Sequence, residues 1–208
     1  MGRVFLKPNN PLLRKVAEEI PISKISSSSI KEIVHEMLKI AYGEQKDNKK
    51  PIMVGLAAPQ IGISKRIILV DVNANGKGGF GKIKVFINPE IVWSSKRKGE
   101  WYEGCYSIPE ICGIVQRSLS IKVKAFTLQP RRLHAKVVEE KYTGYVARIF
   151  QHEIDHLDGK LFIDLIENPN HLHEVKPKEF PLYRNKEAWR NWPKKHPLPL
   201  AYNRLKKV

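Results

Sequence analysis

Cysteines, long apolar runs and acidic side chains are all scarce in this chain. Only Cys105 and Cys112 are cysteines among 208 residues, too few for the disulfide framework of a small secreted protein. We therefore expect a reducing compartment, with thiols free for other chemistry. Because no apolar run approaches the roughly 20 residues that a membrane-spanning helix needs, we also expect no membrane segment and no membrane partner.

Acidic residues are outnumbered by basic ones, since 37 Lys and Arg against 21 Asp and Glu give a formal net charge of +16. Such a charge attracts polyanions such as RNA. We assign most of it to a solvated surface and predict no sequence-specific nucleic-acid binding. The hydrophobic content of 42% and the charged content of 28% are those of a globular protein, and the length suits one compact domain.

Apolar spacing predicts two helices. The first runs from Ser29, which would open it in a capping box, to about Tyr42, before Gly43 as a natural stop. The second runs from about Gly144 to Leu157. Between them, β-branched and alternating segments predict a glycine-rich hairpin loop at residues 73–81 and strands at residues 66–72, 85–87, 91–94, 118–126 and about 133–139. This order favours an α+β fold of mixed, mainly antiparallel sheets packed around a central helix.

The central helix would carry the motif HEIDH, the most informative stretch of the chain. Histidines four residues apart lie on one helical face, so His152 and His156 can bind one metal ion. Glu153 lies close enough to handle the proton of a water held by the metal, as in an HExxH metallohydrolase. A catalytic site of this kind takes three protein ligands. Upstream, Cys105 offers a thiolate, and Gly104 before it lets the backbone approach closely. Downstream, the candidates for the third ligand are Asp164, Glu167, His171 and His173.

Three segments of the chain match one family together. They are GLAAPQ at residues 55–60, EGCYS at residues 103–107 and QHEIDH at residues 151–156. In this order the chain resembles the peptide deformylases, whose signatures are a glycine-hydrophobic-Ala-Ala-x-Gln loop, an E-G-C-hydrophobic-S segment and Q-H-E-x-D-H. The resemblance covers roughly Val4 to Ile166. It implies a metal-dependent hydrolase that removes the N-formyl group from the formyl-methionine of newly synthesised polypeptides and releases formate.

The resemblance also implies roles for residues of the site. One divalent metal ion would be bound, with Fe²⁺ as the native metal and Zn²⁺, Ni²⁺ or Co²⁺ able to replace it. Glu153 would move the proton, while the side-chain amide of Gln60 and the backbone N–H of Tyr106 would donate to the formyl oxygen. The implied metal ligands are Cys105, His152 and His156.

The substrate would bind as an extended N-formyl-methionyl nascent peptide. Such a peptide can pair with an exposed backbone like an added strand. Ile149 lies one turn before His152 on the same helical face, which makes it a candidate wall of the methionine pocket. The predicted substrate-binding residues are Val54, Gly55, Gly104 and Ile149.

The chain departs from the family pattern in several places. Met53 stands where a glycine is usual and is expected to narrow the rim of the site, Tyr106 replaces a common leucine, and Cys112 replaces a common arginine that contacts the peptide.

We predict a catalytic domain at residues 1–167 and a Pro-rich basic extension at residues 168–208 that is not a separate domain. Many bacterial relatives end in a basic helix that docks on the ribosome, so a transient ribosome contact is a further possible partner interaction.

Two other functions stay open at this point. A zincin-like endopeptidase would need one of the downstream third ligands and would cleave internal peptide bonds. A basic RNA- or ribosome-binding module with a structural metal would need a fourth ligand, and Cys112 is not obviously placed to supply it.

Formylated initiation belongs to bacteria and to organelles of bacterial descent. We expect a plastid, an apicoplast or a mitochondrion, with a leader absent from this chain, and keep the bacterial cytoplasm as the alternative.

Overall fold

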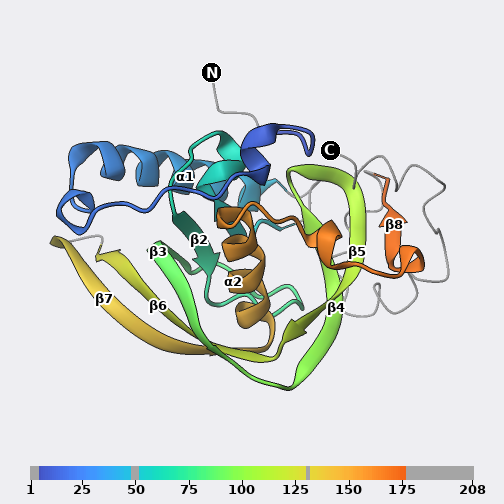
Figure 1. Ribbon diagram of the computed structural model, residues 1–208. Coiled ribbons are helices and arrows are strands. Elements are labelled where there is room, and N and C mark those ends of the chain that lie inside the picture. Colours follow the sequence, from blue (N-terminus) through green and yellow to red (C-terminus); the bar gives the residue numbers. More distant parts are fainter. Residues whose placement is uncertain (1–4, 48–51, 130–131, 177–208) are drawn as a thin grey trace.

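Two antiparallel β-sheets enclose a helix in the structure, a computed structural model that describes residues 5–47, 52–129 and 132–176 (Figure 1). One sheet has the strand order β1-β2-β3-β6-β7 and the other has the order β4-β5-β8. All pairings between these strands are antiparallel, which confirms the predicted α+β class with mainly antiparallel sheets. The strands are β1 (Gly55–Ala57), β2 (Ile67–Asp71), β3 (Ile83–Ser94), β4 (Lys98–Cys105), β5 (Ile108–Ser118), β6 (Ser120–Gln129), β7 (Arg132–Thr143) and β8 (Leu172–Glu174).

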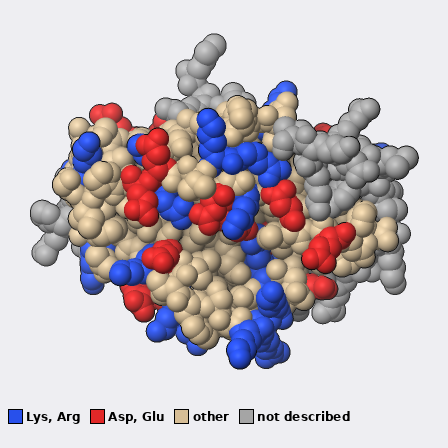
Figure 2. Space-filling model, in the orientation of Figure 1, with Lys and Arg blue, Asp and Glu red and all other residues tan. Residues whose placement is uncertain are grey.

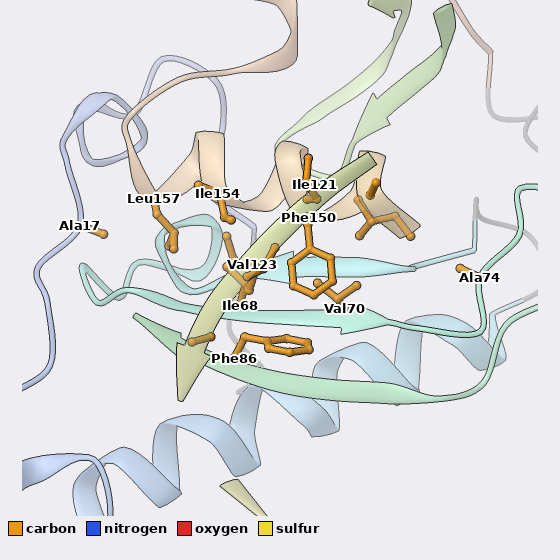
Figure 3. Close-up of a cluster of buried hydrophobic side chains, with 14 residues drawn as sticks. Ala17, Ile68, Val70, Ala74, Phe86, Ile121, Val123, Phe150, Ile154 and Leu157 are labelled. Carbon is orange, nitrogen blue, oxygen red and sulfur yellow. The ribbon is translucent and has the colours of Figure 1, made fainter. Parts of the chain in front are cut away.

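Helix α2 (Gly144–Leu157) is the central helix that the sequence predicts, and it carries the HEIDH motif. Apolar residues recur along it every three or four positions, so one stripe of the helix is buried. This stripe packs against alternate side chains of β2, β3 and β6 (Figure 3). The rings of Phe150 and Phe86 meet edge to face at 4.7 Å between centroids, a favourable aromatic geometry. The packing holds the helix and its two histidines at a fixed height over the sheet.

Helix α1 (Ser28–Lys46) covers the opposite face of the same sheet. Its buried stripe packs with Ile67 and Leu69 of β2, whereas Ile68 and Val70 of that strand pack with α2. Strand β2 is therefore buried on both faces, which explains its continuous apolar run. The buried residues of α1 are Ile30, Val34, Met37 and Ala41.

The structure corrects both predicted limits of α1. The N-cap is Ser27 rather than Ser29. At the other end, the helix passes through Gly43 instead of stopping there. The side chain of Gln45 supports this extra turn, because its amide nitrogen donates to the backbone carbonyl of Met53 at 2.9 Å. A contact across the fold thus outweighs the weak helix propensity of glycine.

The predicted strands are only partly right. The predicted hairpin of β2 and β3 is confirmed. The strands predicted at residues 118–126 and about 133–139 correspond to β6 and β7, which both continue past the predicted ends. β3 is one strand where two were predicted, because register shifts after Ile87 and after Ile91 interrupt its alternation. β1, β4, β5 and β8 were not predicted. β8 pairs with β5, so part of the predicted extension joins a sheet. The domain division at residue 167 stays a prediction, and residues 177–208 lie outside the described residues.

Short 3-10 helices complete the described structure. None of the helices in the described ranges combines the length and apolar character that membrane crossing demands. The 3-10 helices are η1 (Pro11–Arg14), η2 (Ile22–Lys24), η3 (Ala58–Ile61), η4 (Phe162–Leu165) and η5 (Pro169–His171).

Charged side chains of both signs are mixed over the face in Figure 2, with Lys and Arg gathered along its lower edge. Figure 1 places the bend from β3 into β4 at that edge, where Lys96, Arg97 and Lys98 are exposed. Among the Lys and Arg side chains whose exposure the structure describes, only Arg117 and Arg148 are buried. Most of the described basic charge is therefore at least partly solvated, as predicted, and the two buried arginines require a separate explanation.

Candidate metal centre

Two elements bring three metal-binding side chains together. β4 ends at Cys105, and α2 presents His152 and His156 from successive turns. The ligand atoms of the three residues all lie within 4.8 Å of one another, and Cys105 Sγ is 3.3 Å from His156 Nε2. In the part of the chain that the structure describes, this is the one His, Cys, Asp or Glu group that could hold a metal ion. The four downstream candidates for the third ligand are not part of it.

The donor set fits a borderline divalent metal. His152 Nδ1 lies 2.9 Å from the Oε2 atom of Glu103, which assigns the proton to Nδ1 and leaves Nε2 as the ligand atom. His156 directs its own Nε2 atom toward the sulfur. One thiolate and two imidazole nitrogens suit Fe²⁺ or Zn²⁺. Three protein donors are the set of a catalytic site, whereas a closed structural site takes four.

The pKa values of the two histidines are shifted in opposite directions. Burial opposes the charge on His152, but hydrogen bonds with Cys105 and Glu103 raise its pKa well above the usual value. Burial and the nearby charge of His152 lower the pKa of His156. Because a histidine binds a metal ion through an unprotonated nitrogen, a metal ion at this site would compete with a proton for His152.

Glu153 is buried beside the three donors and faces strand β1. A Cβ atom added at Gly55 would overlap Glu153 Oε1 and lie 2.8 Å from Ile149 Cγ2, so these three residues are in close contact. The Oε2 atom of Glu153 is buried without a hydrogen-bond partner among the described residues. Burial raises the pKa of this carboxyl to about 7. The group can therefore both accept and return a proton near neutral pH.

Gln60 approaches the donors from η3. Its Oε1 atom accepts the backbone N–H of Ala57 at 2.8 Å, and this bond directs Nε2 toward Cys105 Sγ at 3.3 Å. The carbonyl of Gln60 accepts the N–H of Leu6 at 2.8 Å. An amide donor is thus fixed next to the metal-binding group, on a buried side chain. Tyr106 directly follows Cys105, in the turn between β4 and β5.

Comparison with known proteins gives the family. A family model described as polypeptide deformylase matches residues 3–171. The peptide deformylase of Thermotoga neapolitana is 39% identical over 170 residues, which cover 82% of this chain and 88% of that protein. The chain belongs to the polypeptide deformylase family. This confirms the predicted family, and with it the activity of a metal-dependent hydrolase that removes N-formyl groups from new polypeptides.

Other deformylases support the same assignment. A crystal structure of the class I type b peptide deformylase from Acinetobacter baumannii with bound Met-Ala-Ser superimposes with a TM-score of 0.69 at 32% identity. The superposition covers 80% of this chain and all of the Acinetobacter baumannii chain. The chloroplastic peptide deformylase 1A of Solanum lycopersicum is 32% identical over 191 residues, which cover 86% of this chain and 64% of that protein.

Two departures from the deformylase pattern have structural consequences. Met53 is 2% exposed and packs in the core beneath α1, so the expectation that it narrows the rim is wrong. Cys112 is also buried, and its sulfur lies 2.8 Å from the place where a side chain at Gly104 would begin. A side chain at position 104 would thus displace the sulfur of its cross-strand neighbour. The substrate roles of Val54, Gly55, Gly104 and Ile149 stay predictions.

The candidate metal centre rests on a buried charge network that the sequence analysis missed. Glu103 of β4 accepts hydrogen bonds from Arg117 of β5 and from Arg148 of α2. It also accepts a hydrogen bond from the Nδ1 atom of His152. Burial alone would raise the pKa of Glu103, but the charge and hydrogen bonds of Arg117 hold it well below the usual range. Arg117 also contacts Asp155, which precedes His156. A signal was present, because an arginine one turn before His152 is unusual on a buried helical face.

Proposed function

We propose that this deformylase hydrolyses the formyl amide of N-terminal formyl-methionine with Glu153 as its acid–base group. The observation that carries the proposal is the joint position of three candidate metal donors, the fixed amide of Gln60 and the buried carboxylate of Glu153, whose Oε2 atom has no hydrogen-bond partner among the described residues. A thiolate, two imidazoles, a proton carrier and an amide donor are the groups that this hydrolysis requires.

Cys105, His152 and His156 would hold the metal, with Fe²⁺ proposed as the native ion and Zn²⁺, Ni²⁺ or Co²⁺ as substitutes. When bound, the metal would supply Lewis-acid activation of the attacking water. Glu153 accepts the proton of this water as the new C–O bond forms at the formyl carbon. It then gives the proton to the leaving nitrogen as the C–N bond breaks, so formate and a free amino terminus are the products. A pKa near 7 suits both halves of this cycle.

Negative charge develops on the formyl oxygen during the attack. The side-chain amide of Gln60 would donate one hydrogen bond to this oxygen, and the backbone N–H of Tyr106 would donate another. The bond from Ala57 N–H to Gln60 Oε1 supports this role, because it prevents the amide from turning its oxygen toward the charge. Donors fixed before the reaction need no reorganisation during it.

The substrate peptide would add to the edge strand β1. β1 is the terminal strand of its sheet, so its outer edge pairs with no other described strand, and β4 is likewise the terminal strand of the second sheet. We propose that Val54 and Gly55 pair with the peptide, that Gly104 lies beside it and that Ile149 lines the methionine pocket. The contact between Ile149 and the Gly55 backbone supports this arrangement. The Acinetobacter baumannii deformylase of similar fold was crystallised with Met-Ala-Ser.

A formyl-peptide assay tests the proposal. The metal-loaded chain should release formate from formyl-Met-Ala-Ser and leave casein intact. Glu153→Ala should retain the metal and lose about 10²–10⁴-fold in kcat, the usual contribution of a general acid–base group. Cys105→Ser, the matched ligand variant, should instead lower the metal content measured by elemental analysis. Near-wild-type deformylation by Glu153→Ala would remove this residue from its role.

We further propose that the substrates are nascent chains made in an organelle of bacterial descent, a plastid, an apicoplast or a mitochondrion. The chloroplastic relative from Solanum lycopersicum supports this compartment, while the relatives from bacteria keep the bacterial cytoplasm as the alternative. A transient ribosome contact is part of the same proposal. The basic charge of residues 177–208, with nine Lys or Arg against two Asp or Glu, supports it.

A further inference from the structure

The carboxylate of Glu103 is the centre of the buried network beneath the metal site. Its Oε1 atom accepts hydrogen bonds from Arg117 Nε at 2.9 Å and from Arg148 Nη1 at 2.7 Å. Its Oε2 atom accepts Arg117 Nη2 and His152 Nδ1, both at 2.9 Å. Four donors therefore fix both oxygens, and one of the donors is the ring that would bind the metal. Any rotation of this carboxylate would turn the imidazole with it.

Arg148 connects this carboxylate to three elements of the fold. It lies on α2 one turn before His152, so the two side chains share a helical face. Besides Glu103, its guanidinium donates to the carbonyl of Val115 on β5 at 2.9 Å and to the carbonyl of Gly99 on β4 at 2.7 Å. The planar group with its five N–H donors can make these three contacts at once, which a lysine ammonium on a flexible stem cannot do in the same geometry.

A second arginine is not needed to neutralise Glu103 alone, because Arg117 already forms two parallel bonds with it. Arg117 is shared with Asp155, however, and the network then contains two carboxylates. Arg148 balances the second charge. Arg148 is 6% exposed, and burial lowers its pKa, so its charge is retained against a desolvation cost. Such a cost indicates a role beyond packing.

We propose that Arg148 is a positioning residue for the metal site. It acts through Glu103, whose carboxylate it holds at the angle that directs Nε2 of His152 toward Cys105 and His156. The inference rests on the proposed ligand set of these three residues. Loss of Arg148 would keep all three ligand residues in the chain but allow Glu103 and His152 to reorient together, so the bound metal would escape faster.

A matched control is a second arginine that contacts the same helix from outside it. Arg66 of the β2 segment also anchors α2, because its guanidinium donates to Asp158 at 2.8 Å and to the carbonyls of Leu157 and Pro89 at 3.4 Å. It therefore ties α2 to neighbouring elements through one carboxylate and two carbonyls, as Arg148 does. No contact of Arg66 reaches a proposed metal ligand. Arg66→Met thus reproduces the structural loss without the positioning loss.

The experiment compares the full chain with the variants Arg148→Met, Arg148→Lys and Arg66→Met, each loaded with Zn²⁺. Release of the metal to a chromogenic chelator and the melting temperature are measured together. Arg148→Met should release Zn²⁺ about 10-fold faster. This is the lower end of the roughly 10–100-fold loss in metal affinity that follows removal of a direct partner of a ligating histidine, because Arg148 acts through Glu103. Arg66→Met should lower the melting temperature and release Zn²⁺ at the wild-type rate.

Equal release rates for Arg148→Met and the wild type, or equal acceleration in both methionine variants, would overturn the role of Arg148. Should Arg148→Met not fold, Arg148→Lys decides, because it keeps the charge and loses the three-way geometry. Faster release is then expected, and an unchanged rate overturns the inference. A wild-type chain that takes up no Zn²⁺ would instead overturn the proposed ligand set, so the two failures are distinguishable.

Discussion

Gly55 shows how a residue without a side chain can control the position of a catalytic group. Its Cα faces Glu153 and Ile149 so closely that no Cβ atom can be added without displacing one of them. The carboxylate of Glu153 is thereby pressed against the edge strand along which the substrate is proposed to bind. Space at Gly55, rather than backbone conformation, is what requires glycine, because its φ angle is not in the left-handed region.

Gly55→Ala should therefore impair catalysis without removing the metal. The new methyl group would displace the Glu153 carboxylate, and a shift of about 1 Å in such a group can cost about 100-fold in rate. We expect this loss in kcat for formyl-Met-Ala-Ser, with the metal content of the wild type. A wild-type kcat in Gly55→Ala would show that Glu153 can move aside without consequence, and the proposed geometry would be wrong.

The site could be predicted from the sequence only where its residues belong to a helical pattern or to a recognisable short motif. His152, Glu153 and His156 follow from helical spacing, and Cys105 and Gln60 follow from motifs that resemble those of a family. Glu103, Arg117 and Arg148 come from three different elements, and their contacts span 14 and 45 positions. Spacing rules such as those for helices contain no information on these pairings. The network required the folded structure.

At the scale of elements, strong local periodicity was read correctly and tertiary contacts explain the errors. α2 has the predicted limits because its apolar stripe is long and regular. β4 and β5 were missed because glycine and charged residues break their alternation, as at Gly99 and Gly104 of β4. Pairing with each other along their whole length stabilises them instead. α1 extends past Gly43 because Gln45 bonds to the carbonyl of Met53 and to Asp71 at the end of β2.

Gly43→Ala follows from this description of α1 and should stabilise the protein. Gly43 lies inside the helix, and no described atom outside its own helix backbone lies within 4 Å of a Cβ added there. Alanine in a helix interior is favoured over glycine by about 0.5–1 kcal/mol. Thermal unfolding should show a rise of about 2 °C in the melting temperature.

The same variant is the control for Gly55→Ala, because the substitution is identical and only the surroundings differ. Gly43→Ala should deformylate at the wild-type rate. A lower melting temperature would mean that the last turn of α1 is strained by its bonds to Met53 and Asp71 and cannot accept a better helix former.

At the scale of the whole molecule, the metal site joins the two sheets. Cys105 is the last residue of β4 in the three-stranded sheet, whereas His152 and His156 belong to a helix that packs on the five-stranded sheet. Glu103 and Arg148 make a second link at the same level, between β4 and α2. A metal bound by all three donors would therefore resist separation of the two halves of the fold, because it binds the folded arrangement and not the unfolded chain.

Removal of the metal should consequently destabilise the entire domain. A ligand present at 100 times its dissociation constant stabilises the folded state by about 2.7 kcal/mol. For a chain of this size that corresponds to roughly 5–10 °C in the melting temperature. We expect chelation to lower the melting temperature of the wild type by this amount and to leave that of Cys105→Ser almost unchanged, because the variant retains little metal to lose. An equal fall in both proteins would show that the chelator acts elsewhere, and no fall in either would mean that the three donors do not link the sheets through a metal.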